Sequence, residues 1–232
     1  MTRWTRFPWS TRRRLALAAV LVVLFVMLSY GVAKGWTDGF DKGVLHALRA
    51  GSPDPWGPEL MPEIVRDITA LGSTAVGIIA MVLATVWTFV ARRPKTATLQ
   101  VLLVSVGVGL VYILKDVFGR TRPDIFPDML VRHGASYPSG HTMTATVVYL
   151  TVSLFLLRGQ VRWKLRIYLL SSAAIVAVMV GLSRVYLGAH FPTDVMAAWL
   201  LGSAWALFAS AVADWAARMG WAERSEGGEP GA

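Results

Sequence analysis

Three short polar segments hold the residues whose types and spacing could do chemistry. They cover positions 115–123, 137–141 and 183–194, and each adjoins an apolar stretch. Each segment taken alone could also have a purely structural role. The first could hold cations at a membrane edge, the second could be a capped helix start, and the third could be a buried polar pair. Ionisable residues beside membrane spans are costly and mostly functional, so the three segments together favour a reaction site.

The first two segments suit an anionic ligand. Lys115 and Arg122 are seven residues apart, so in a continued helix they would share a face and repel each other unless an anion lay between them. Ser139 and Gly140 would open a helix whose N-terminal N–H groups can bind an anion, and Gly140 lets a ligand approach the backbone closely. His141 would lie in the first turn of that helix.

The third segment adds a candidate nucleophile. His190 and Asp194 are four residues apart, so the carboxylate can accept a hydrogen bond from the imidazole and fix its tautomer and orientation. Arg184 precedes them. With His141 and the cations of the first segment, the chain holds one nucleophile, one proton donor and several positive charges, which is the inventory of phosphoryl transfer.

Composition predicts a membrane protein. The chain has 232 residues, 55% hydrophobic and 16% charged, with a mean hydropathy of +0.52 and no cysteine. Soluble domains carry about 25% charged residues. The lack of cysteine excludes a disulfide, a thiolate metal site and a cysteine nucleophile. The net charge of +9 comes mostly from short loops beside apolar stretches, which is typical of membrane topology, so we expect no nucleic-acid partner.

Six apolar stretches must position these segments, and they predict an all-α bundle of six transmembrane helices, since about 20 residues cross the hydrocarbon layer. The stretches are Leu15–Ala33, Ile68–Ala91, Thr96–Leu114, Thr142–Leu157, Ile167–Leu182 and Val195–Val212. The first is longer than the apolar core of about 7–15 residues of a signal peptide, so we expect an uncleaved anchor. We also expect a short helix on the outer membrane surface, with Asp41 and Lys42 off its apolar face. That face holds Phe40, Val44, Ala47 and Leu48.

The basic residues predict the orientation. With the N-terminus inside, 14 of the 23 Lys and Arg residues fall in inside segments and 9 in outside ones. This excess indicates cytoplasmic termini and places the three polar segments on the extracytoplasmic face, in the plasma membrane.

The three segments resemble the signature of the type 2 phosphatidic acid phosphatase family, which is related to the vanadium haloperoxidases. That signature reads KxxxxxxRP, then PSGH, then SRxxxxxHxxxD. Every fixed position is met, from Lys115 to Arg122-Pro123, at Pro138-Ser139-Gly140-His141, and from Ser183-Arg184 to His190 and Asp194.

The resemblance implies a haloperoxidase-like helical core, a lipid phosphate substrate in the bilayer, and hydrolysis without metal or cofactor. His190 would form a phosphohistidine, Asp194 would orient it, and His141 would protonate the leaving group. The phosphate would be held by five residues: Lys115, Arg122, Ser139, Gly140 and Arg184. The chain would then divide into a cytoplasmic segment (1–14), a six-span phosphatase domain (15–218) and a disordered cytoplasmic tail (219–232).

Three alternatives stay open from the sequence. These are a haloperoxidase that binds vanadate, which the six spans disfavour; a non-catalytic membrane protein that binds anionic headgroups, which needs no His190–Asp194 pair; and transfer of the phosphate to an alcohol. The lipid could be phosphatidic acid, phosphatidylglycerol phosphate or undecaprenyl diphosphate. The sequence does not fix the oligomeric state.

Overall fold

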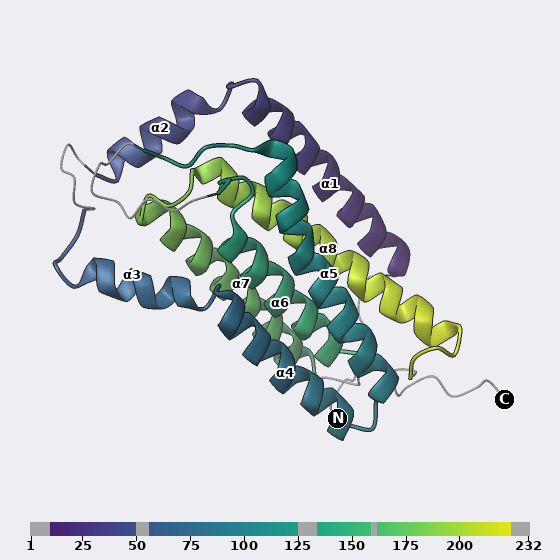
Figure 1. The fold of residues 1–232 in the computed structure, drawn as a ribbon. Helices are drawn as coiled ribbons and strands as arrows, with labels where there is room; N and C mark the ends of the chain where they lie inside the picture. The colour runs from purple at the N-terminus through teal and green to yellow at the C-terminus, as the bar shows by residue number, and fades with distance from the viewer. Residues whose placement is uncertain (1–9, 50–55, 125–133, 159–161, 224–232) are drawn as a thin grey trace.

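The structure is a computed structural model that describes residues 10–49, 56–124, 134–158 and 162–223. The described residues form a bundle of helices (Figure 1). In chain order the helices are α1 (Thr11–Ala33), α2 (Asp38–Ala47), α3 (Met61–Ala70), α4 (Thr74–Val90), α5 (Pro94–Phe118), α6 (Gly140–Leu156), α7 (Trp163–Tyr186) and α8 (Pro192–Arg218). The predicted all-α fold is confirmed.

The predicted six spans are not all seen as single long apolar helices. Four helices, α1, α5, α7 and α8, are long and apolar enough to cross a membrane. The second predicted stretch forms α3 and α4, which are bent by 47° and count as a fifth span if taken as one. The sixth candidate, α6, is apolar but has only 17 residues. A count of six therefore stays a prediction.

Local chemistry explains where these helices begin and end. α4 begins after Ser73, whose hydroxyl accepts the Val76 N–H at 3.3 Å, as expected of an N-cap. α5 and α8 have proline in their first turn, where its missing N–H costs no helix hydrogen bond. α5 stops at Gly119, which has a left-handed φ of 55°. α1 begins at Thr11, so Arg12, Arg13 and Arg14, which precede the first apolar stretch, belong to the helix.

The centre of the bundle is α8, which packs against α1, α5, α6 and α7. Small residues let helix backbones approach closely in a membrane. The buried face of α8 is accordingly rich in alanine: Ala197, Ala198, Ala204, Ala206, Ala209, Ala211, Ala213, Ala216 and Ala217. This close packing holds the ends of several helices near one another.

Two tryptophans of α8 sit over glycines of neighbouring helices. The Trp199 ring covers Gly181 of α7, and its Nε1 donates to the Ala177 carbonyl at 2.9 Å. The Trp205 ring covers Gly107 of α5, and its Nε1 donates to the Leu103 carbonyl at 2.8 Å. In both pairs the accepting carbonyl lies four residues before the glycine. A Cβ on either glycine would overlap the ring, so these positions require glycine.

Polar contacts tie the described ends of the chain together at the end of the bundle opposite α2 and α3 (Figure 1). Arg14 of α1 binds Ser210 and Asp214 of α8, and Arg158 reaches the same Asp214 at 2.6 Å. The Glu223 carboxylate accepts the N–H groups of Lys95 and Thr96, at 3.0 and 2.8 Å, at the start of α5. Residues 224–232 of the predicted disordered tail lie outside the described residues.

We expect Gly107→Ala to destabilise the protein by about 1–3 kcal/mol, because the added methyl overlaps the Trp205 ring. Gly109→Ala is the matched control on the same helix, since a Cβ there meets nothing within 4 Å. Thermal unfolding in detergent measures the difference. Equal unfolding temperatures for the two variants would contradict the packing described for α8.

Candidate active site

The three polar segments meet at the end of the bundle that also carries α2 and α3 (Figure 1). The Ser139 N–H donates to the Asp194 carbonyl at 3.0 Å, which joins the second segment to the third. Arg122 Nη1 donates to the Ala189 carbonyl at 3.0 Å, which joins the first to the third. The structure thus gathers the ends of α5, α6, α7 and α8 at one place, as the sequence predicts.

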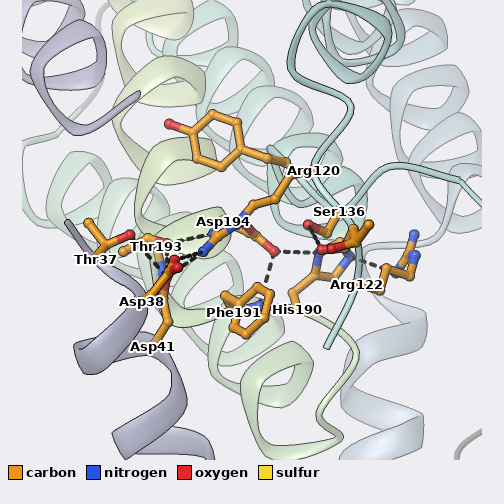
Figure 2. A network of polar contacts seen from close by, with 12 residues as sticks. Thr37, Asp38, Asp41, Arg120, Arg122, Ser136, His190, Phe191, Thr193 and Asp194 are labelled. Atoms are coloured by element: carbon orange, nitrogen blue, oxygen red, sulfur yellow. Dashed lines mark hydrogen bonds and ion pairs between the residues drawn. The ribbon is translucent and has the colours of Figure 1, made fainter. Parts of the chain in front are cut away.

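At the centre of this place lies the His190–Asp194 pair (Figure 2). His190 is 1% exposed and Asp194 is fully buried. His190 Nδ1 and Asp194 Oδ2 are 3.3 Å apart, and the same oxygen accepts the Phe191 N–H at 3.0 Å. On the other side of the ring, Nε2 is 3.4 Å from Arg122 Nη1.

These neighbours fix the tautomer of the His190 ring. A guanidinium can only donate and an ionised carboxylate can only accept. Nδ1 therefore carries the proton and donates to Asp194, while Nε2 keeps a lone pair on the side of Arg122. A lone pair on the nitrogen that faces a cation is the arrangement a histidine nucleophile needs.

Burial lowers the pKa of His190 to about 4. The hydrogen bond and the charge of Asp194 act in the opposite direction, and Arg184 and Arg122 lower the pKa further. The ring is therefore neutral around neutral pH. Because an unfolded chain would bind this proton at a higher pH, protonation should cost stability as the pH falls from about 6.5 towards 4.

The predicted phosphate-binding cations surround this histidine. Lys115, at the end of α5, donates from Nζ to the Ala135 carbonyl at 2.8 Å, and its Cε lies 3.8 Å from where a Cβ of Gly140 would be. Arg184, at the end of α7, is 1% exposed, and its Nη1 donates to Thr69 of α3 at 3.1 Å. Arg122 and Arg184 act electrostatically on His190, and Lys115 acts on Asp194, so three positive charges lie near the His190–Asp194 pair.

The start of α6 brings Ser139, Gly140 and His141 to the same site. Ser139 is the N-cap of α6, as the sequence predicts, but in the described residues no backbone N–H of the helix donates to its hydroxyl. That hydroxyl is fully buried and accepts instead from the Thr142 hydroxyl at 2.9 Å. His141 lies in the first turn, and its carbonyl is 2.7 Å from where a Cβ of Gly72 would be. Glycine at the bend between α3 and α4 thus lets α6 approach closely.

Three residues next to this site were not predicted from the sequence: Asp41, Arg120 and Thr193. Asp41 lies off the predicted apolar face of the surface helix, and yet it is fully buried, while Phe40 on that face is 54% exposed. Leu45, one turn after Asp41, is also buried, so these two residues form the packed face of α2. Arg120 lies two residues before Arg122 in the first polar segment.

Metal ligation has no candidate in the part of the chain that the structure describes, where no three His, Asp or Glu residues are grouped so that they could hold an ion. The carboxylates beside the site are engaged otherwise: Asp194 by His190, Phe191 and Arg120, and Asp41 by Arg120 and Thr193. What the arrangement offers chemically is a neutral, oriented imidazole next to several cations, which suits attack on a phosphate.

We expect nitrogen NMR of histidine-labelled protein to show His190 neutral at about pH 6, with its proton on Nδ1, where an ordinary imidazole would be largely protonated. The burial and the two ring contacts are the physical reason. Comparison with His190→Gln assigns the signal. An imidazolium signal from His190 at this pH, or a proton on Nε2, would contradict the assigned tautomer.

Comparisons with known proteins agree with this geometry. The model of the PAP2 superfamily matches residues 96–218. Phosphatidylglycerophosphatase B of Bacillus subtilis is 34% identical over 185 residues, 78% of this chain and 87% of that protein. An undecaprenyl-diphosphatase of Sulfolobus acidocaldarius is 37% identical over 124 residues, 51% of this chain and 55% of that protein.

The fold comparison points the same way. The crystal structure of a transmembrane PAP2-type phosphatidylglycerolphosphate phosphatase from Bacillus subtilis has a TM-score of 0.73 and 26% identity, and covers 83% of this chain and 93% of its own. The predicted family and an integral membrane bundle are both confirmed. This chain belongs to the PAP2 superfamily.

Proposed function

We propose that this protein is a membrane phosphatase that removes a terminal phosphate from a lipid through a phosphohistidine at His190. The observation that carries the proposal is the His190 ring, whose unprotonated Nε2 lies 3.4 Å from Arg122 and whose Nδ1 is held by Asp194. The activity class agrees with the relatives, which are named phosphatidylglycerophosphatase B, undecaprenyl-diphosphatase and lipid A 1-phosphatase.

In the first step the lone pair of His190 Nε2 attacks phosphorus and the bond from phosphorus to the leaving oxygen breaks. His141 gives its proton to that oxygen, which leaves as an alcohol or as a lipid monophosphate. The ring now bears a phosphoryl group on Nε2 and a positive charge, which the Asp194 carboxylate stabilises through Nδ1–H.

In the second step water attacks the phosphoryl group. His141, now neutral, takes a proton from the water, and the nitrogen–phosphorus bond breaks to return a neutral His190. Lys115, Arg122 and Arg184, with the Ser139 hydroxyl and the Gly140 N–H, stabilise the charge on the phosphate oxygens during both steps. Fixed cations would thereby supply the charge stabilisation that metal ions give in other phosphatases.

We also propose that the site faces away from the cytoplasm, in the plasma membrane. Two observations support this orientation. The described ends of the chain lie at the end of the bundle opposite the site, as the contacts of Arg14 with Asp214 and of Glu223 with α5 require. The predicted inside segments also hold 14 of the 23 basic residues.

We expect His190→Ala to lower phosphate release by roughly 10³-fold or more, because the phosphoryl group loses its acceptor. Purified protein in detergent is assayed with phosphatidic acid, phosphatidylglycerol phosphate and undecaprenyl diphosphate, and the panel also identifies the substrate. Unchanged thermal unfolding of the variant serves as the folding control. Turnover near that of the wild type would refute a nucleophilic His190, and an inactive wild type would favour a headgroup-binding protein.

A second prediction concerns topology. The natural chain has no cysteine, so single cysteines can be introduced without background. Lys42→Cys on α2 and Met219→Cys after α8 both lie at exposed positions at opposite ends of the bundle. A membrane-impermeant maleimide added to whole cells should label the first and spare the second. The reverse labelling would place the site in the cytoplasm.

A further inference from the structure

We infer that Asp41, Arg120 and Thr193 form a positioning unit that holds the Asp194 carboxylate against His190. This inference rests on the proposed function, because it assigns these residues a role in the step that Asp194 supports. None of the three belongs to the sequence signature. They come from α2, from the loop after α5 and from the first turn of α8, and they meet around Asp194 (Figure 2).

The start of α8 explains why such a unit is needed. The first N–H groups of a helix have no partner within the helix. Phe191 occupies the N-cap position, and its side chain has no acceptor to offer. Asp194 accepts the Phe191 N–H at 3.0 Å, and Asp41 of α2 accepts the Thr193 N–H at 3.0 Å. A carboxylate from elsewhere in the chain thus replaces the missing cap.

Arg120 links the two buried carboxylates. Its Nη1 donates to Asp194 Oδ1 at 2.7 Å and to the Thr193 hydroxyl at 2.8 Å, and its Nη2 donates to Asp41 Oδ2 at 2.7 Å. The guanidinium also lies over the Phe191 ring, 4.3 Å from its centre. Thr193 completes the unit, since its hydroxyl donates to Asp41 Oδ2 at 2.6 Å.

The consequence for Asp194 is geometric. Oδ1 is held by Arg120 and Oδ2 by the Phe191 N–H, so the carboxylate is fixed in rotation with Oδ2 towards His190 Nδ1. The Arg120 contact, at 2.7 Å, is much shorter than the His190 contact, at 3.3 Å. Charge-assisted hydrogen bonds of about 2.7–2.9 Å are the strong ones, so Arg120 rather than His190 dominates the orientation of the carboxylate.

Asp41 acts on Asp194 indirectly, through Arg120 and Thr193. Among the described residues its hydrogen bonds run to Thr37, Arg120 and Thr193, and not to His190 or a predicted phosphate-binding residue. Asp41→Asn keeps the size of the side chain, removes its negative charge and replaces one acceptor with a donor that faces either the Arg120 guanidinium or the Thr193 N–H. The Asn variant should therefore release Arg120 and let Asp194 turn, while the phosphate-binding cations stay in place.

The experiment compares Asp41→Asn with Asp38→Asn in lipid phosphate hydrolysis. Asp38 is the matched control, one turn earlier on α2, 55% exposed and 3.8 Å from Arg120. We expect Asp41→Asn to lower kcat by roughly 10- to 100-fold, in line with other groups that orient a functional histidine, with KM and inhibition by vanadate changed less than about 2-fold. Asp38→Asn should leave all three within about 2-fold of wild type.

A second comparison separates positioning from a structural role. In an Asp194→Asn background, Asp41→Asn should have less than about a 2-fold further effect on kcat, since the group it acts through is already changed. If Asp41→Asn does not fold, Thr193→Val and Thr193→Ser replace it: the valine variant should lower kcat and the serine variant should restore it.

The outcomes are distinct. Equal kcat for Asp41→Asn and Asp38→Asn would overturn this inference, as would a full effect of Asp41→Asn in the Asp194→Asn background. In either case an inactive His190→Ala variant would still support the proposed phosphatase function. Parallel losses in kcat and vanadate affinity would also overturn it, because they would mean that the whole site had collapsed. A wild-type protein without phosphatase activity would overturn both proposals.

Discussion

The first turn of α8 is the point on which the rest of the site depends. The Asp194 carboxylate accepts hydrogen bonds from the His190 ring, the Phe191 N–H and the Arg120 guanidinium. The backbone carbonyl of Asp194 accepts the Ser139 N–H. A buried carboxylate must be fully hydrogen-bonded, since an unpaired one is far too costly in an apolar interior. The hydrogen bonds to Asp194 therefore hold the loop after α5, the start of α6 and the start of α8 next to one another.

The site must also keep a histidine unprotonated next to an anionic partner while it gathers cations for a phosphate. Asp194 alone would raise the pKa of His190, but burial of the ring and the charges of Arg184 and Arg122 act the other way and win, leaving the pKa at about 4. The same cations that would attract a phosphate therefore keep the lone pair on Nε2 available. Binding and nucleophilicity are linked by one charge distribution.

The sequence predicted the features that repeat or that have fixed spacing, and it missed those that depend on contacts between distant segments. Apolar length predicted the helices, and the His190–Asp194 spacing predicted their pairing. The bend between α3 and α4 lies at Gly72, which packs against the His141 carbonyl, and at the Ser73 N-cap. The apolar length of the stretch predicted one span and did not take these two local signals into account. Asp41 was missed because its partners, Arg120 and Thr193, are 79 and 152 residues away.

The region matched by the family model excludes α2 and α3, although both helices contact residues of the candidate site. The match covers residues 96–218, which include every signature position. Yet Arg184 donates to Thr69 on α3, and the cap of α8 comes from Asp41 on α2, both before the matched region. The matched region thus carries the predicted site residues, whereas α2 and α3 supply contacts to Arg184 and to the first turn of α8. Variation in α2 and α3 can therefore tune the orientation of Asp194 and Arg184 without touching the signature.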